Sequence, residues 1–268
     1  MRIFRYIGII VCLGVVLVGI QFRGAIRTSI AEQVAKRRLP RAVNVSEVKD
    51  LPAMAGRLPT FVGDPSTPLR SAQGDNYVGL PLEFNLAVPF TSQAPFAVWD
   101  AIHEDACEEA SVIMVDAFYK NKRLTAKSAD EEILSTVEWE TNTFGYWKDT
   151  TIEETARILR EKYGYKNVRV VYDPSLDDIK REILKGHPVI IPAAGQLLYN
   201  RYFHQPGPLY HMLVVRGWLK NGDIITNDPG TKRGEGYIYR PEILMSAIHD
   251  WNNGDVIHGR KAMLIVEN

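Results

Sequence analysis

The stretch "HEDACEEASVIMV", residues 103–115, carries the strongest prediction about the fold. Its polar start leads into an apolar run in which Ala110, Ile113 and Met114 recur at the spacing of one helical face. We therefore expect a helix that begins at Cys107 and packs this face against a core.

The chain beyond this helix predicts further helices and then strands. Start and stop signals predict three helices, one beginning at Ser128, one with a capping box from Thr150 to Glu153 and an end at Gly164, and one from Asp173 to Gly186. Strand-like runs occur at residues 86–90, 187–194, 211–218, 223–228, 236–240 and 261–267. Helices followed by strands are typical of an α+β domain with an antiparallel sheet.

Composition supports a folded body and argues against several classes of function. Residues 1–41 hold eight Lys and Arg against one Glu, so the rest of the chain has 24 basic and 31 acidic side chains. An acidic body argues against nucleic acid as a partner. Two cysteines are too few for a disulfide framework, and no Cys and His spacing resembles a zinc site, so we expect neither a metal nor a cofactor.

The N-terminus resembles a membrane-targeting segment. An uninterrupted apolar run covers residues 6–20, with Arg2 and Arg5 before it and several basic residues after it. We interpret residues 1–23 as an uncleaved signal anchor, or transmembrane helix, with a cleaved signal peptide as the alternative. The basic residues after the run leave the orientation open. We predict a membrane anchor, a partly ordered linker over 24–85, and one domain over 86–268.

Cys107 occupies a position that suits a nucleophile. The start of a helix presents unpaired N–H groups and the positive end of the helix dipole, and both favour thiolate over thiol. The charges of Glu108 and Glu109 oppose ionisation, so a nearby imidazolium would be needed. The alternative is that Cys107 is simply a small buried apolar residue.

Two residues near the C-terminus could complete a catalytic site. His211 begins one apolar strand, "HMLVVRGW", and Asp228 ends the next, "ITNDPGT". A short turn near Asn221 could place the two side chains together, and a carboxylate beside an imidazole fixes its tautomer and stabilises its charged form. Taken singly, His211 could be an ordinary buried histidine and Asp228 a turn residue.

Five motifs in order carry a resemblance to a known family. "VPFTSQ", "DACEEAS" fourteen residues past the glutamine, "GHPVII", "HMLVVRGW" and "ITNDPGT" resemble the papain-like cysteine peptidases related to the bacteriocin-leader, or double-glycine, processing peptidases. The resemblance covers roughly residues 86–267. It implies a papain-like fold in which Cys107 is the nucleophile, His211 the general base and acid, Asp228 its orienting partner, and Gln93 part of the oxyanion hole.

The resemblance also implies a function and its alternatives. We expect a membrane-anchored thiol hydrolase that cuts peptide or protein substrates through an acyl-enzyme, with its catalytic domain outside the cytoplasm. Glu108, Tyr210, His204 and Trp99 are candidate substrate contacts. Glu108 stands where the family usually has glycine, which leaves open a tethered peptide-binding module without catalysis. A cell-wall amidase or acyltransferase is the other alternative.

Overall fold

The computed structural model describes residues 80–267, which belong to one compact unit, and all structural statements refer to this part of the chain. The predicted anchor and most of the predicted linker lie outside the described residues. Within them, no helix has both the length and the apolar character needed to cross a membrane.

Helices and strands alternate along the chain, whereas the sequence predicted a group of helices followed by a group of strands. The α-helices are α2 (Cys107–Tyr119), α3 (Ala126–Phe144), α4 (Ile152–Arg157), α5 (Leu176–Leu184) and α6 (Pro241–Ala247). Shorter helical turns are the π-helix η2 (Ile158–Lys162) and the 3-10 helices η3 (Gly195–Leu198) and η4 (Val256–His258). The strands are β1 (Phe84–Asn85), β2 (Asn167–Tyr172), β3 (Val189–Ala193), β4 (His211–Trp218), β5 (Ile224–Asn227), β6 (Tyr237–Tyr239) and β7 (Ala262–Glu267).

The strands form one antiparallel sheet, as predicted. Their order is β2-β7-β3-β4-β5-β6, and β1 adds a short pairing to β4. Strand β4 therefore lies in the interior of the sheet, where its two main neighbours are β3 and β5. This position brings the first residue of β4 close to the end of β5.

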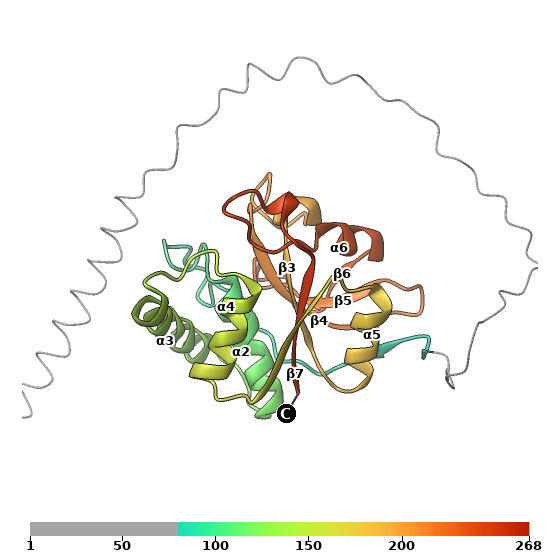
Figure 1. The fold of residues 1–268 in the computed structure, drawn as a ribbon, viewed down its shortest axis with the longest axis horizontal. Helices are drawn as coiled ribbons and strands as arrows, with labels where there is room; N and C mark the ends of the chain where they lie inside the picture. The colour runs from blue at the N-terminus through green and yellow to red at the C-terminus, as the bar shows by residue number, and fades with distance from the viewer. Residues whose placement is uncertain (1–79, 268) are drawn as a thin grey trace, which may run out of the picture. The chain divides into compact units, whose positions relative to one another are not determined.

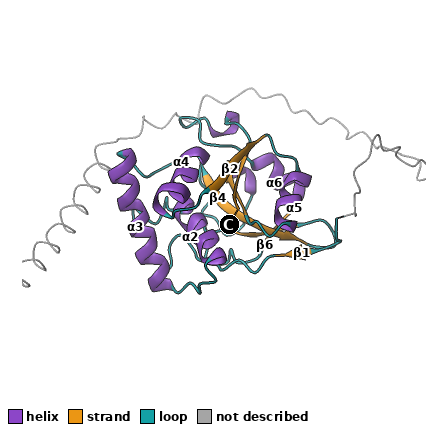
Figure 2. Cartoon of the chain, turned by 60° about the horizontal axis from the view of Figure 1, so that its bottom comes forward, coloured by secondary structure: helices purple, strands orange, loops and turns teal. Residues whose placement is uncertain are grey.

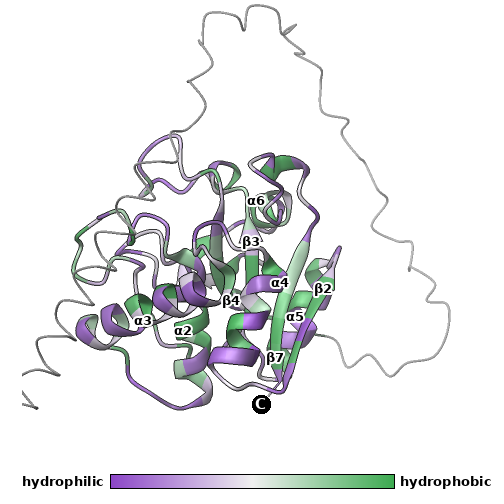
Figure 3. Ribbon diagram, turned by 60° about the vertical axis from the view of Figure 1, so that its left-hand side comes forward, coloured by the Kyte–Doolittle hydropathy of each residue, from purple (hydrophilic) through white to green (hydrophobic). Residues whose placement is uncertain are grey.

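Helices cover both faces of the sheet, which gives three layers. Figure 1 shows α2, α3 and α4 on one side of the strands and α5 and α6 on the other. Alternate residues of β4 divide accordingly, because Met212 and Val214 join the core under α2 and α4, whereas Leu213 and Val215 join the core under α5 and α6. Figure 3 shows apolar residues along the strands and polar residues on the outer sides of the helices. The fold class is therefore α+β with a sheet buried on both sides.

Several predicted boundaries shift by one or two residues because the capping residue is a different one. Helix α4 is capped by Thr151, whose side chain accepts from the Glu154 N–H, so the predicted box from Thr150 is displaced by one residue. Helix α5 is capped by Ser175 instead of Asp173. In each case the side chain at the true cap reaches the N–H three residues on, which satisfies an unpaired donor of the first turn.

The predicted strand at residues 86–90 is wrong, and the pairing lies just before it. Strand β1 pairs with β4 through Phe84 and Trp218, ahead of the expected domain start at residue 86. Pro89 has no N–H for a ladder. The neighbouring carbonyls of Val88 and Pro89 instead accept hydrogen bonds from the side chain of Asn227. Figure 2 shows β1 as a short strand at the border of the sheet.

Candidate active site

Cys107 is the first residue of α2, as predicted, and it lies in the core. Ala106 precedes the helix without a side-chain cap, so the first turn keeps N–H groups that no capping side chain satisfies. The thiol is 4% exposed, and its Sγ donates to Glu108 Oε2 at 2.9 Å. The backbone N–H of Met212, the residue after His211, also bonds to the sulfur. The nucleophile candidate therefore lies against the start of β4.

His211 and Asp228 form a hydrogen-bonded pair across two neighbouring strands. The His211 Nε2 lies 2.8 Å from Asp228 Oδ1, and both side chains are buried. Strands β4 and β5 pair in an antiparallel register that sets Val214 opposite Asn227, so the residue after β5 reaches back toward the start of β4. The hairpin at Gly222 thus accounts for the contact that the sequence predicted.

Three further donors hold the Asp228 carboxylate. Asn200 Nδ2 and Tyr239 O–H donate to its Oδ2 at 2.9 and 2.5 Å, and the Gly230 N–H donates to its Oδ1 at 3.0 Å. Burial alone would raise the pKa of Asp228, but the charge and hydrogen bond of His211, with those of Tyr239 and Gly230, hold it below its usual value. Asp228 therefore remains ionised and fixed in orientation.

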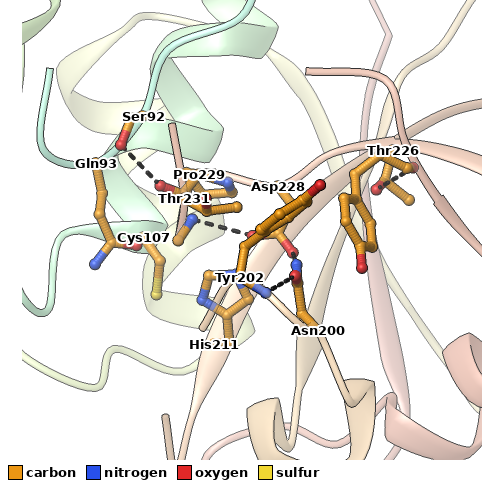
Figure 4. A network of polar contacts seen from close by, with 12 residues as sticks. Ser92, Gln93, Cys107, Asn200, Tyr202, His211, Thr226, Asp228, Pro229 and Thr231 are labelled. Carbon is orange, nitrogen blue, oxygen red and sulfur yellow. Dashed lines mark hydrogen bonds and ion pairs between the residues drawn. The ribbon is translucent and has the colours of Figure 1, made fainter. Parts of the chain in front are cut away.

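Cys107 points toward the imidazole, and Asp228 lies at the other side of the ring. Figure 4 shows the sulfur directed at the His211 ring, opposite the edge that meets Asp228. Phe203 packs edge-on against the same ring at 5.2 Å between centroids and 77° between planes. With Nε2 bonded to Asp228, the other ring nitrogen, Nδ1, is free to exchange a proton with the thiol.

Carboxyl groups surround the thiol and disfavour its ionisation. Burial raises the pKa of Cys107 well above its usual value, and the charge and hydrogen bond of Glu108 and the charge of Glu109 add to the effect. The Met212 N–H acts in the opposite direction. Burial likewise raises the pKa of Glu108 well above its usual value, and it raises that of Glu109 to about 7. The thiol is therefore hardest to ionise when Glu108 is charged.

The family model that matches this chain is the Peptidase_C39 like family, over residues 85–253. The chain belongs to this family. Its family and fold are therefore those of papain-like cysteine peptidases, which are hydrolases. The match contains Gln93, Cys107, His211 and Asp228, and it ends before β7.

Two solved structures resemble the C39-like chain at low identity. A protein described as a C39-like peptidase from Bacillus anthracis is 14% identical, covers 69% of this chain and 98% of its own, and has a TM-score of 0.46. A fragment of prointerpain A from Prevotella intermedia is 12% identical, covers 69% of this chain and 72% of its own, and also has a TM-score of 0.46. No curated protein matches.

Gln93 lies in the loop before α2, but its amide is engaged elsewhere in this C39-like chain. Its Nε2 donates to the carbonyls of His103 and Glu104 at 3.0 and 2.9 Å, and its Oε1 is buried without a protein partner. Both N–H bonds of the amide are thus used. A contribution to an oxyanion hole requires the exchange of one of them for substrate, so this role stays a prediction.

The four predicted substrate contacts divide by exposure. Trp99 is 43% exposed and His204 is also exposed, so both can touch a bound peptide. Glu108 and Tyr210 are buried; Glu108 accepts a hydrogen bond from the Cys107 thiol, and the Tyr210 O–H donates to Asp250 Oδ1 at 3.0 Å. These two side chains make internal contacts in the structure, and their contact with substrate stays a prediction.

Two histidines of the described chain have acidic partners of their own. His103 is 6% exposed, and its Nδ1 lies 2.8 Å from Asp100 Oδ1. His187 belongs, with Glu182 and Glu267, to the one group of described residues whose ligand atoms lie close enough for a metal ion. Arg169 already bridges both glutamates of that group, which satisfies their charge.

Local sequence patterns did not reveal the residues that support Asp228 and His211. Asn200 and Phe203 lie in the long connection between β3 and β4, and Tyr239 ends β6. Gly230 alone had a signal, because "NDPG" is a turn sequence, but its position against the imidazole follows from the fold. Long-range strand pairing brings these side chains together.

Proposed function

We propose that the protein hydrolyses amide bonds of peptides or proteins through an acyl-enzyme on Cys107. The observation that carries the proposal is the placement of one imidazole between two partners. The Cys107 sulfur points at the ring, and the ring's Nε2 lies 2.8 Å from a buried, ionised Asp228. Such an arrangement suits proton transfer to and from a nucleophile.

In the first step His211 takes the thiol proton on Nδ1, and the sulfur attacks the substrate carbonyl carbon. Asp228 stabilises the resulting imidazolium without accepting its proton. The oxygen of the tetrahedral intermediate gains negative charge, which the N–H groups at the start of α2 can stabilise. Gln93 contributes a second donor if it gives up one of its two backbone carbonyls.

In the second step the imidazolium returns its proton to the leaving amine. The C–N bond breaks, the amine departs, and the acyl group remains on the sulfur as a thioester. His211 then removes a proton from water, the resulting hydroxide attacks the thioester, and the thiol is regenerated. No metal or organic cofactor takes part in these steps.

Cys107→Ala and His211→Ala test the chemistry directly. The full chain is incubated with a mixed peptide library, and products are identified by mass spectrometry. We expect cleaved peptides with the wild type and a loss of at least roughly 10³-fold with either variant, because the residues act as a unit. Undiminished cleavage by Cys107→Ala would overturn the proposal. Addition of primary amines distinguishes acyltransfer, which yields amide products, from hydrolysis.

The absence of cleavage in the wild type would instead favour a peptide-binding module. In that case the same library, passed over immobilised Cys107→Ala and wild-type protein, should retain the same peptides on both. The burial of the thiol and its contact with Glu108 favour this second candidate. Retention without products would establish it.

We also propose that the domain is anchored to a membrane and lies outside the cytoplasm. The apolar run at residues 6–20 supports the anchor. Arg2 and Arg5 before the run favour a cytoplasmic N-terminus, and the basic residues after it favour the opposite orientation. Reporter fusions after Ser92, one active only inside the cytoplasm and one active only after export, test this orientation. Activity of the cytoplasmic reporter alone would contradict it.

A further inference from the structure

Glu108 contacts the nucleophile and faces away from solvent. Cys107 and Glu108 are consecutive in the first turn of α2, and Glu108 is 1% exposed. Its Oε2 accepts the thiol hydrogen at 2.9 Å. The proposed catalytic steps do not use this carboxyl, although it touches the reacting atom. A buried carboxyl in that position affects whether the sulfur can ionise.

Other acidic and neutral groups, but no paired cation, surround Glu108. The groups that face it come from several elements: Cys107 and Glu109 on α2, Glu140 on α3, Asp149 before α4, and Tyr210 just before β4. Lys148, beside Asp149, is an ion-pair partner of Asp105. Among the ion pairs of residues 80–267, none involves Glu108, Glu109 or Glu140.

We propose that Glu108 is a proton-dependent restraint on Cys107, which holds the nucleophile as a neutral thiol when charged and releases it when protonated. The inference deepens the proposed function, on which it rests. With Glu108 charged, ionisation of the thiol would place two negative charges at the 2.9 Å contact. With Glu108 protonated, its O–H can donate to the sulfur.

The proton count gives the direction of the effect. In the restrained state the sulfur carries a proton, the Glu108 carboxylate carries none, and the His211 imidazole is neutral with Nδ1 unprotonated. Uptake of one proton by Glu108 allows the thiol proton to move to His211 Nδ1, which leaves a thiolate, an imidazolium and a neutral carboxyl. Burial raises the pKa of Glu108 well above its usual value, so Glu108 takes up this proton at a higher pH than an exposed glutamate does, and it becomes charged as the pH rises through that raised pKa. Above that pKa the reactivity of Cys107 is therefore suppressed.

Alkylation of Cys107 in Glu108→Gln tests the restraint. The glutamine is neutral and keeps a donor for the sulfur. Full-chain protein is treated with iodoacetamide at pH 5 and pH 7.5, and mass spectrometry of the Cys107 peptide excludes signal from Cys12. At pH 7.5 we expect the variant to react roughly 3- to 10-fold faster than the wild type, for about one unit of lowered thiol pKa. At pH 5 the two should agree within about twofold.

Glu109→Gln is the matched control, because it removes a neighbouring carboxyl that does not touch the thiol. A smaller acceleration is expected. Equal rates for Glu108→Gln and wild type at both pH values, or equal acceleration by the two variants, would overturn the inference. Circular dichroism verifies folding, and Glu108→Ala, which also removes the charge, replaces Glu108→Gln if that variant misfolds.

Failure of this inference and failure of the proposed function are distinguishable. A wild type that cleaves no peptide but shows the expected alkylation difference would overturn the hydrolase mechanism and leave the restraint in place. Peptide cleavage with identical pH profiles for wild type and Glu108→Gln would leave the hydrolase in place and overturn the restraint.

Discussion

At the scale of single residues, the orientation of His211 depends on a glycine. A Cβ added to Gly230 would lie 2.7 Å from Phe203 Cε1 and 2.9 Å from His211 Cε1. Such distances require one of the rings to move. We expect Gly230→Ala to lower kcat roughly 10- to 100-fold in the peptide-cleavage assay, because a small misplacement of a reacting group has a large effect. The protein should remain folded by circular dichroism.

The neighbouring phenylalanine provides the control for this prediction. Phe203→Leu removes the ring that the new Cβ would meet first. The double variant should therefore recover part of the activity lost by Gly230→Ala, as contacting residues are not additive. If the loss of kcat in the double variant equals the sum of the two single losses in free energy, the clash with Phe203 is not the cause of the Gly230→Ala defect.

At the scale of elements, the sequence predicted regular patterns and missed those set by tertiary contacts. The helix from Cys107 and the strand from His211 were predicted with their correct starts, because apolar spacing defines both. Strand β2 was missed; four residues separate it from the π-helix η2, and four of its six residues are only partly buried. Cap positions depend on which of two adjacent side chains turns inward, as at Thr150 and Thr151. Periodicity does not encode that choice.

A carboxylate on α5 joins this helix to two strands. Glu182 lies 2.8 Å from Arg169 of β2, which also binds Glu267 of β7 at 2.7 Å. Burial opposes ionisation of Glu182, but hydrogen bonds from His187, Lys185 and Arg169 lower its pKa to about 2. Glu182→Gln should reduce the free energy of unfolding by about 1–2 kcal/mol at pH 7. This figure is smaller than the pKa shift alone would give, because Arg169 is 40% exposed and solvent screens the ion pair.

The pH dependence identifies the source of that loss. A lowered pKa stabilises the fold above the unfolded value of about 4.3, and this contribution disappears as pH falls toward 2. Urea unfolding at pH 7 and pH 3 should therefore show a smaller difference between wild type and Glu182→Gln at the lower pH. Glu267 pairs with Arg169 but with neither Lys185 nor His187, so Glu267→Gln should reduce the free energy of unfolding by less than Glu182→Gln does. An equal difference at both pH values would contradict the assignment.

At the scale of the whole molecule, the site is assembled from distant parts of the chain. Sequence order correctly paired His211 with Asp228, because a short hairpin connects their strands. The supports of Asp228 could not be predicted, since Asn200 and Tyr239 reach it only after β4, β5 and β6 have paired. Likewise, the burial of Glu108 follows from the packing of α2 against β4. Sequence motifs predict which groups react, whereas the fold determines the surroundings that shift their pKa values.

Buried carboxyls between α2 and α3 make the stability of the whole domain depend on pH. Glu109 and Glu140 are each 0% exposed, and their carboxyl oxygens have no partner in the described chain unless one of the two carboxyls carries a proton and donates it to the other. Burial raises the pKa of Glu109 to about 7 and that of Glu140 well above its usual value. The folded state therefore binds more protons than the unfolded state above about pH 4.3. The free energy of unfolding should fall from pH 5 to pH 7.

Glu140→Gln tests the origin of this decline. The amide keeps a donor for Glu109 and removes one ionising group, so urea unfolding of the variant should show a shallower decline between pH 5 and pH 7. Glu182→Gln is the control, because Glu182 changes its charge only below about pH 4.3. The control should keep the wild-type slope in this range. If Glu140→Gln also keeps the wild-type decline between pH 5 and pH 7, groups other than Glu109 and Glu140 bind the proton. The Glu109–Glu140 pair would then not be the cause of the pH dependence.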